Sequence, residues 1–317
     1  MPEQLSARAD VCAVVVTYHP DSDFPARLNG IVPQVGGTVV VDNGSCEESS
    51  SMLRKLSGGP GLTLINNLEN LGVARALNIG VRHAVTHGYS WALLLDQDTE
   101  VDEDMVEKLL AAHASYPDAD RVAVVGTRFR DTNERPAEPR YLDSKDDHWE
   151  EVESVITSGS LLSLNIYAAV GPFRDEFFID YVDTEYCFRA RAAGYRIIET
   201  RRPFMSHTIG APTRHRVLGT TTWTTNHSPD RRYYIARNNT VLLREYGTTG
   251  GGSWRMKSIV RCLRLCKRIA FFEQGKVEKI LAVAQGWWDG MRGKLGPRGS
   301  ASQYATKPRP TSSTFLR

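Results

Sequence analysis

Short apolar runs alternate with longer amphipathic segments along the first part of the chain. The runs, rich in Val, Leu and Ile, lie at 11–16, 38–41, 62–65, 91–95 and 122–125, and the amphipathic segments include 69–87 and 102–115. A strand that is apolar on every side is buried on both faces, as in a parallel sheet that helices cover. The pattern predicts a doubly wound α/β domain with a mostly parallel, Rossmann-like sheet and helices on both faces.

Polar residues follow three of these runs directly. They are Thr17, Tyr18, His19 and Pro20 after the first run, Asp42, Asn43, Gly44 and Ser45 after the second, and Asp96, Gln97 and Asp98 after the fourth. Ligands of open α/β sheets bind beyond the carboxyl ends of the strands, so we predict one shared ligand site here. Asp42 taken alone is explained equally well as the N-cap of the next helix.

The pair Asp96 and Asp98 indicates a metal site. Both carboxylates stand at the mouth of an apolar strand, where negative charge is costly without a counter-ion. Hard oxygen ligands with room for phosphate oxygens suit Mg²⁺ or Mn²⁺ better than zinc. An exposed loop is the alternative, because the Asp-x-Asp pattern is common by chance.

A second acidic group lies in the segment 177–196, where Asp180, Asp183 and Glu185 follow two phenylalanines. Helix capping explains one or two of these acids. Three acids crowded beside aromatic residues indicate a carboxylate that acts as a general base.

Two later features add polar chemistry. His207 follows an extended segment, and a lone histidine there is explained either as a structural residue or as a metal ligand. In 228–239, helical spacing places Tyr234, Arg237 and Asn238 on one face, which suits anionic or hydroxyl-rich groups. A solvated basic helix with buried tyrosines is the alternative.

Six motifs in this order resemble the family 2 inverting glycosyltransferases of GT-A fold, and among them the bacterial rhamnosyltransferases of cell-surface polysaccharide assembly. They are VVVTYHP (14–20), VDNGS (41–45), ENLGVARALNIGV (69–81), LLLDQDTEV (93–101), TSGSLLS (157–163) and FFIDYVDTEYCFRARAAGYR (177–196). With RRYYIARNN (231–239) and WWDGMRGKLG (287–296), which are typical of the same subgroup, the resemblance spans 11–294.

The resemblance implies a nucleotide-sugar donor. Thr17 and Tyr18 would flank the base, and Asp42 would accept the N3–H of thymine or uracil, which favours a dTDP- or UDP-sugar. Ribose and diphosphate would meet Asp96, Gln97 and the helix that Asn70 and Gly72 precede. That helix carries Arg75 and Asn78, and its N-terminus suits an anion.

The resemblance also assigns the chemistry. Asp183 aligns with the catalytic base, and His207 joins Asp96 and Asp98 as a ligand of Mg²⁺ or Mn²⁺. Many family members have Glu-Asp where this chain has Val182 and Asp183, so the assignment of Asp183 depends on the residues that follow it. Glu185 would then have a supporting role at the acceptor. The implied reaction is a single displacement with inversion, most simply of L-rhamnose from dTDP-β-L-rhamnose to a lipid-linked saccharide.

The charge is unevenly distributed. The net charge is +2, yet residues 251–317 hold 14 Lys and Arg against 3 Asp and Glu, so they carry +11 and residues 1–250 carry −9. A helical period over 254–272 places Ile259, Leu263, Cys266 and Ala270 on one stripe and Lys257, Arg261, Arg264 and Arg268 largely opposite. Trp287 and Trp288 follow. We predict a GT-A domain over 1–250, a basic amphipathic helical extension over 251–299 and a flexible, Ser/Thr/Pro-rich tail over 300–317.

The extension has two interpretations. A basic amphipathic helix near tryptophans is typical of peripheral contact with an anionic membrane. A helix that packs on the core and leaves its basic face in water fits the same pattern.

Composition bears on location. The content of 41% hydrophobic and 24% charged residues excludes a disordered chain. Five cysteines without a CxxC pair favour a reducing cytoplasm. The N-terminus lacks signal-peptide features, and no run reaches the ~18 apolar residues of a spanning helix. We expect a cytoplasmic protein, peripheral on the inner face of the membrane if the acceptor is lipid-linked.

Two other hypotheses stay open. An enzyme of the same fold with another donor, such as UDP-galactofuranose, fits the sequence equally well, because the sequence does not show which residues form the sugar pocket. A protein of another class would bind nucleic acid through the basic end or hold a nucleotide without catalysis. The acidic body and the lack of a nucleic-acid-reading motif argue against a nucleic-acid partner.

Overall fold

The computed structural model describes residues 8–59, 61–131, 149–207, 213–217, 220–247 and 251–299. The predicted tail over 300–317 lies outside them. All five apolar runs form strands, which are β1 (Val11–Thr17), β2 (Gly37–Asp42), β3 (Leu62–Asn66), β4 (Trp91–Asp96) and β6 (Val122–Asp131). The predicted strands are therefore confirmed.

These strands belong to one large mixed sheet. Its order is β3-β2-β1-β4-β8-β6-β9-β5, and β7 also pairs with β9. The added strands are β5 (Glu100–Val101), β7 (Trp149–Glu151), β8 (Ser160–Ser163) and β9 (Arg196–His207). The pairs β1–β2, β2–β3, β1–β4 and β6–β9 are parallel. Strand β8 is antiparallel to both β4 and β6, and β5 and β7 are antiparallel to β9. The prediction of a mostly parallel sheet is confirmed for the longest pairings, and the shorter antiparallel ones make the sheet mixed.

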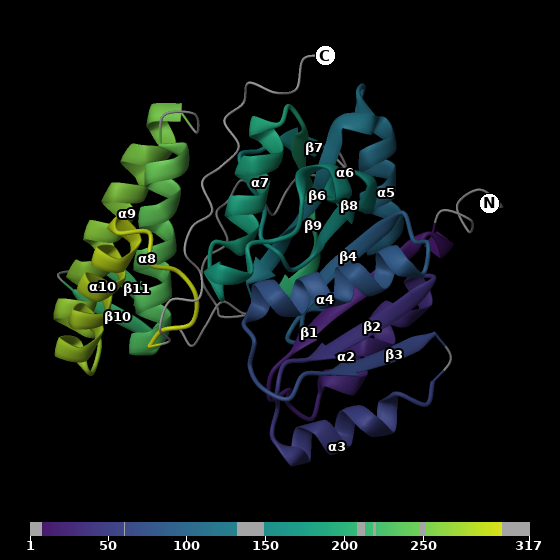
Figure 1. The fold of residues 1–317 in the computed structure, drawn as a ribbon, viewed down its shortest axis with the longest axis horizontal. Coiled ribbons are helices and arrows are strands. Elements are labelled where there is room, and N and C mark those ends of the chain that lie inside the picture. The colour runs from purple at the N-terminus through teal and green to yellow at the C-terminus, as the bar shows by residue number, and fades with distance from the viewer. Residues whose placement is uncertain are drawn as a thin grey trace.

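Helices cover both faces of this sheet because alternate strand residues point to opposite sides. Cys12, Val14 and Val16 of β1 pack in one core cluster with α4, α6 and α7, and the residues between them pack in another with α2, α3 and α5. In Figure 1, α4 lies above β1 and β2, and α3 lies below β3. The helices are α2 (Phe24–Ile31), α3 (Glu47–Leu56), α4 (Val73–Thr86), α5 (Met105–Ser115), α6 (Leu164–Val170) and α7 (Val182–Ala192), with short 3₁₀ helices at Val32–Gln34, Ala119–Arg121 and Asp175–Phe177.

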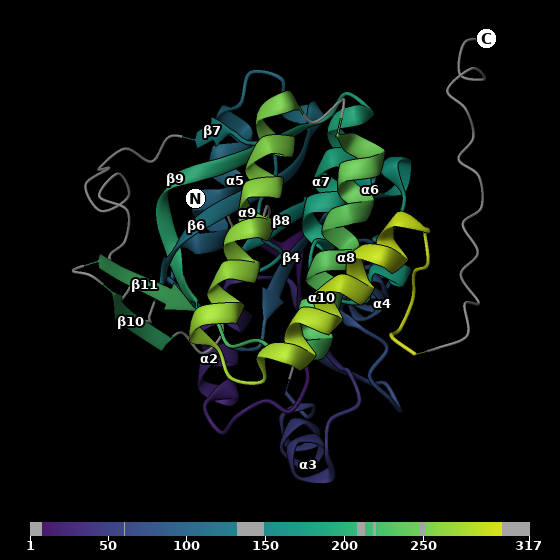
Figure 2. The ribbon, with the colours of Figure 1, turned by 90° about the vertical axis from the view of Figure 1, so that its left-hand side faces the viewer.

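Three long helices form the other side of the molecule and face the viewer in Figure 2. They are α8 (Pro229–Tyr246), α9 (Gly251–Phe272) and α10 (Lys276–Met291), beside a hairpin of β10 (Thr213–Val217) and β11 (Thr220–Thr224). The predicted C-terminal helical extension is present. No helix in the described ranges combines the length and apolar content needed to cross a bilayer.

Helices α8 and α10 approach each other closely through two glycines of α10. A Cβ added to Gly286 would lie 2.3 Å from the carbonyl O of Tyr233, and one added to Gly290 would lie 2.6 Å from that of Arg237. Contacts this close are open only to residues without a side chain. Helices α8 and α10 thus pack tightly, although the predicted domain boundary at residue 250 lies between them in the sequence. The predicted division into domains stays a prediction.

Candidate active site

A cavity of about 620 Å³ lies at the carboxyl ends of β1 and β4, where the polar clusters predict a ligand site. We call it the triad cavity, after the three residues Asp96, Asp98 and His207 in its wall. Its walls include eight residues of the predicted site: Tyr18, Asn70, Gly72, Asp96, Gln97, Asp98, Asp183 and His207. Segments far apart in the sequence converge here because the parallel strands end at one edge of the sheet.

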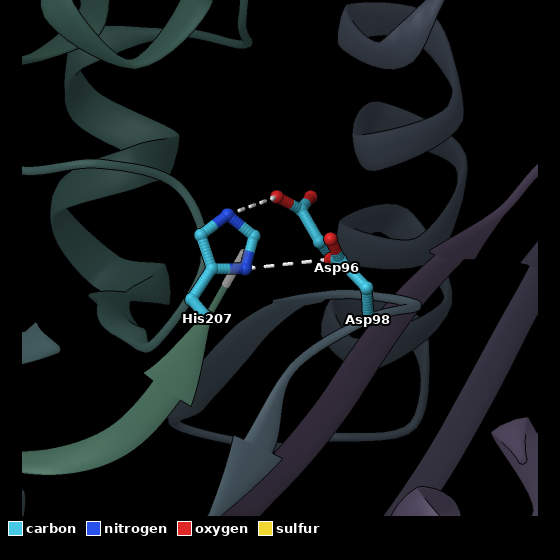
Figure 3. Close-up of side chains that lie close together, drawn as sticks. All are labelled: Asp96, Asp98 and His207. Atoms are coloured by element: carbon cyan, nitrogen blue, oxygen red, sulfur yellow. Dashed lines mark ion pairs between the residues drawn. The ribbon is translucent and has the colours of Figure 1, made fainter. Parts of the chain in front are cut away.

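Asp96, Asp98 and His207 form a cluster in this cavity (Figure 3). Nδ1 of His207 lies 3.3 Å from Oδ1 of Asp98, and Nε2 lies 3.8 Å from Oδ2 of Asp96. One ligand atom from each residue lies within 4.8 Å of the other two. His207 reaches the two carboxylates because β9 is long and ends at this residue.

The donor set of this cluster fits a hard divalent cation. The pKa of Asp96 is raised to about 6, mainly by burial and also by the charges of Asp98 and Asp183, while His207 and Arg231 oppose the rise. Carboxylates this close together repel each other, and a bound cation stabilises their charged form. Two carboxylates and one imidazole, beside open space for further oxygen ligands, suit Mn²⁺ or Mg²⁺.

Asp183 stands in the first turn of α7 and is held from two sides. Its Oδ2 accepts a 3.1 Å hydrogen bond from the main-chain N–H of Thr157, and its Oδ1 accepts one of 2.6 Å from that of Thr184. Burial raises the pKa of Asp183, although both N–H groups oppose the rise. The side chain lines the triad cavity and also a second cavity beside α9, which we call the α9 cavity. A carboxylate at this junction can take a proton from a group in one cavity as it reacts in the other.

The chain that leads into Asp183 is strained. Phe178, Asp180 and Tyr181 have φ angles of 66°, 64° and 62°, which is left-handed backbone for three non-glycine residues. Each such residue costs roughly 1–3 kcal/mol, so the surrounding structure must hold the segment in place. Asp180 is paired with Arg231, whose Nη2 lies 3.1 Å from its Oδ1.

Arg237 and Asn238 provide much of that restraint. Nδ2 of Asn238 donates to the carbonyl oxygens of Ile179 at 2.9 Å and Asp180 at 2.8 Å, and Nη2 of Arg237 donates to that of Phe177 at 3.0 Å. Both side chains are fully buried and line neither cavity. The structure thus gives them a positioning role, and their predicted contact with substrate stays a prediction.

Tyr234, the third residue of the predicted face of α8, is also buried. Its ring stacks on that of Phe178 with centroids 5.0 Å apart, and its hydroxyl accepts a 2.7 Å hydrogen bond from the main-chain N–H of Arg298. This arrangement matches the alternative of buried tyrosines. It also fixes one side of the strained segment.

At the predicted base-binding end, Thr17 and Asp42 are buried and bonded to each other. Oγ1 of Thr17 donates to Oδ1 of Asp42 at 3.1 Å, and the hydroxyls of Ser45 and Ser50 also donate to this carboxylate. Asp42 is 1% exposed and does not line the triad cavity. The N-cap of α3 is Cys46, so Asp42 does not have the capping role either.

Tyr18, by contrast, is exposed on the cavity wall and is held by Gln97. Its main-chain N–H donates to Oε1 of Gln97 at 2.7 Å, and Nε2 of Gln97 donates to its carbonyl O at 3.2 Å. Gln97 therefore joins the ends of β1 and β4 and fixes the main chain of Tyr18 on the cavity wall.

Asn70 and Gly72 line the cavity at the start of α4. Oδ1 of Asn70 accepts a 2.9 Å hydrogen bond from Nδ2 of Asn43. Gly72 has a φ of 86°, and a Cβ there would lie 2.6 Å from the ring of Phe178. Gly72 is thus needed for the close approach of α4 to the strained segment.

Arg75 and Asn78, farther along α4, do not line the triad cavity. Arg75 is exposed. Asn78 is buried, where Nδ2 donates to the carbonyl O of Phe173 at 2.8 Å and Oδ1 accepts from the hydroxyl of Tyr167 at 2.7 Å. Its position matches the packing alternative, and contact of either residue with the donor stays a prediction.

Glu185 lies away from both cavities. It is fully buried, and its carboxylate pairs with Arg189 at 2.9 Å and accepts a 3.0 Å hydrogen bond from the hydroxyl of Tyr246. Residues two apart on a helix point in nearly opposite directions, which separates Glu185 from Asp183. Glu185 thus packs α7 against α8, and its predicted role at the acceptor stays a prediction.

The triad cavity is also lined by residues outside the predicted site, and the polar ones include Thr157, Ser158 and Arg231. Ser158 accepts a 3.2 Å hydrogen bond from the main-chain N–H of Asp96, and Arg231 adds a guanidinium whose charge interacts with Asp96 and Asp98. In the sequence, Thr157 and Ser158 could have been found as two polar residues just before the buried strand β8. For Arg231, the signal was its place in the first turn of α8.

Comparisons with known proteins identify the family of this chain. The sequence model described as "Glycosyl transferase family 2" matches residues 14–170. The dTDP-rhamnosyl transferase RfbF of Shigella flexneri is 30% identical over 249 residues, which are 75% of this chain and 81% of RfbF. The galactofuranosyltransferase GlfT1 of Mycobacterium tuberculosis is 31% identical over 112 residues, or 33% of this chain and 36% of GlfT1.

Solved structures show the same architecture. TarS 1–349 of S. aureus matches with a TM-score of 0.57 at 13% identity, over 88% of this chain and 80% of that one. GalNAc-T7 with UDP, GalNAc and Mn²⁺ matches with a TM-score of 0.53 at 12% identity, over 89% and 56%. The fold is that of the GT-A glycosyltransferases. Together with the 30% identity to a rhamnosyl transferase over most of its length, this shows that the chain belongs to glycosyltransferase family 2.

Proposed function

We propose that this glycosyltransferase moves L-rhamnose from dTDP-β-L-rhamnose to a saccharide acceptor with inversion at the anomeric carbon. The observation that carries the proposal is the position of Asp183 at the junction of the triad cavity and the α9 cavity. The donor is supported by the similarity to a dTDP-rhamnosyl transferase.

In the proposed reaction, Asp183 takes the proton of an acceptor hydroxyl as the hydroxyl oxygen attacks C1 of the donor sugar. The bond from C1 to the diphosphate oxygen breaks, and the nucleoside diphosphate leaves with the electron pair. The raised pKa of Asp183 suits this role, because a more basic carboxylate takes the proton more readily. The N–H of Thr157 keeps the carboxylate oriented.

Asp96, Asp98 and His207 would hold Mn²⁺ or Mg²⁺. Such a cation, when bound, neutralises the charge that develops on the departing diphosphate. The Mn²⁺ in the GalNAc-T7 structure supports this choice. Arg231 adds a fixed positive charge on the same wall.

The remaining walls would bind the nucleoside. We propose that Tyr18 stacks on the base, that Asp42 accepts its N3–H after the Ser45 hydroxyl turns away, and that Asn70 and Gly72 face the ribose or diphosphate. UDP-galactofuranose is a second candidate donor, which the similarity to GlfT1 over 112 residues favours.

A donor screen tests the function. The full chain with Mn²⁺ or Mg²⁺ is given dTDP- and UDP-sugars, and release of the nucleoside diphosphate is measured with and without saccharide acceptors. We expect release from dTDP-β-L-rhamnose. Selective release from UDP-galactofuranose would replace the donor, and no release from any donor would contradict the enzymatic function in favour of a non-catalytic nucleotide-binding protein.

We further propose a lipid-linked acceptor and peripheral contact of α9 and α10 with an anionic membrane. Large apolar side chains are exposed on these neighbouring helices, namely Met256, Ile259, Leu263, Phe271, Val277, Ile280, Leu281, Trp287, Trp288 and Met291. Basic side chains on the same helices complement anionic lipid headgroups.

Vesicle co-sedimentation tests the membrane contact. The W287S/W288S variant should bind anionic vesicles less than the natural chain does. Leu68→Ser removes an even more exposed apolar side chain before α4, far along the chain from these helices, and serves as the control. Equal binding of all three proteins would contradict the contact.

A further inference from the structure

The α9 cavity has a volume of about 790 Å³ and borders Asp183 on the side of α9. It shares Ile156, Asp180, Tyr181 and Asp183 with the triad cavity. A molecule in the α9 cavity therefore has access to the proposed base without occupying the metal cluster. Under the proposed function the donor occupies the triad cavity, so the α9 cavity offers the acceptor an adjoining space beside Asp183.

Three arginines of α9 line this cavity. Arg261, Arg264 and Arg268 are spaced by three and four residues, so they lie on one side of the helix. Arg261 lies near Tyr181 at the junction, where its charge opposes the rise that burial causes in the pKa of that tyrosine. In Figure 2, α9 runs alongside α8, which contributes the buried Arg232 to the same cavity.

The charges of this cavity are unequally balanced. Arg232 is paired with Glu273, and Asp180 is paired with Arg231. Within the described part of the chain, Arg264 and Arg268 have no ion-pair partner. The α9 side of the cavity thus presents positive charge that no carboxylate of the described residues compensates.

Guanidinium groups bind phosphate well, since their planar N–H donors match phosphate oxygens and their charge does not titrate. Apolar side chains of the same helix also line the cavity, among them Met256, Val260 and Leu265. Positive charge next to apolar surface suits a phosphate ester that carries a hydrocarbon chain.

We propose that Arg264 and Arg268 bind the phosphate or diphosphate group of the acceptor in the α9 cavity, so that a hydroxyl of the attached saccharide meets Asp183. This inference rests on the proposed function and adds to it the chemical class of the acceptor and the residues that recognise it. A diphosphate on a lipid and a free diphosphate share this chemistry, and the experiment separates them.

Binding of farnesyl diphosphate, inorganic pyrophosphate and farnesol to the full chain is measured by calorimetry. EDTA is present so that no metal gathers diphosphate at Asp96, Asp98 and His207. The variants are R264Q/R268Q and, as a matched control, K267Q, which removes an exposed charge of α9 that does not line the cavity. Binding of UDP with Mn²⁺ by each variant reports that the fold is intact.

We expect the natural chain and K267Q to bind farnesyl diphosphate alike, and R264Q/R268Q to bind it at least about ten-fold more weakly. If pyrophosphate binds as tightly as farnesyl diphosphate, the site is supported and recognises the phosphate groups alone. If pyrophosphate binds more weakly than farnesyl diphosphate, the site is supported and also recognises the lipid chain. The proposal is overturned if farnesol binds as well as its diphosphate, if R264Q/R268Q binds normally, or if K267Q is weakened equally.

This result is separable from the proposed function. If the donor screen finds activity but farnesyl diphosphate binding does not depend on Arg264 and Arg268, only the acceptor assignment fails. If no donor is used but the arginine-dependent binding is observed, the sugar transfer fails and the anion site stands.

Discussion

The main-chain N–H of Thr157 donates a 3.1 Å hydrogen bond to Oδ2 of Asp183. The bond joins the segment before β8 to the first turn of α7, and Ser158 of the same segment accepts a hydrogen bond from the N–H of Asp96. One short stretch of chain therefore positions both the proposed base and the metal cluster. The metal cluster and the proposed base are therefore held in one cavity by the main-chain N–H of Thr157 and the side-chain hydroxyl of Ser158.

Asp183→Asn should lower turnover by ~10²–10⁴-fold, the usual contribution of a general base. The amide keeps the shape of the side chain but cannot take the proton, so binding of UDP with Mn²⁺ should change little. Steady-state kinetics and calorimetry measure the two quantities. Asp180→Asn is the comparison, since Asp180 lines the same cavities in an ion pair with Arg231. Near-normal turnover of D183N would remove Asp183 from the base role.

The pH profile should reflect burial of Asp183. Because burial raises its pKa, the base becomes protonated at a higher pH than an exposed aspartate, for which the pKa is ~3.9. Activity at saturating Mn²⁺ should therefore fall as the pH drops, beginning above the range of ordinary aspartates. In D183N, the residual activity should lose this acid limb. An unchanged limb in D183N would assign it to another group.

Removal of a cluster ligand should weaken metal binding. Asp98→Asn and His207→Asn each delete one of three donors, so the affinity for Mn²⁺ in the presence of UDP should fall by at least about ten-fold. Glu103→Gln changes a nearby exposed acid outside the cluster and should leave affinity unchanged. Chelation with EDTA should remove the activity of the natural chain. Full activity in EDTA would show that the cluster serves another purpose.

Arg231→Gln should weaken binding of the donor. The change removes a positive charge from the wall of the triad cavity, where charge-assisted hydrogen bonds contribute about 1.5–3 kcal/mol. We expect KM for the donor to rise roughly ten-fold or more. Arg54→Gln breaks an exposed ion pair with Glu47 on α3 and is the matched control. Equal KM values for the two variants would contradict a role of Arg231 at the donor.

Gly286→Ala should destabilise the protein. The new Cβ would lie 2.3 Å from the carbonyl O of Tyr233, and overpacking of this kind costs about 1–3 kcal/mol. The gain from replacing a helical glycine is roughly 0.5–1 kcal/mol, so the clash should prevail. Urea unfolding measures the difference. Gly58→Ala, where the new Cβ meets nothing within 4 Å, should not show the loss.

The alternation of apolar runs and amphipathic segments was sufficient to predict five strands and the two covered faces of the sheet. Burial on both sides leaves a direct mark on a strand, because every position must then be apolar. The sequence of strand β8 does not show this apolar pattern. It has only four residues, and its antiparallel place between β4 and β6 is decided by pairing with strands distant in the sequence.

The acidic cluster was likewise predicted only in part from the sequence. The positions of Asp96 and Asp98 after an apolar strand indicate a metal site in the sequence alone, since charge at such a place needs a counter-ion. His207 lies more than 100 residues later, and only the length and register of β9 bring its imidazole to within 3.3 Å of Asp98.

Helix α8 separates sequence from tertiary structure most clearly. Its residue types indicate binding groups, and they do bind, but Arg237 and Asn238 bind the main chain before α7 while Arg231 faces the cavity. A sequence specifies which residues share a side of a helix, because that depends on 3.6 residues per turn. Which side meets the core and which meets the cavity depends on packing against α9 and α10, and only the folded chain decides it.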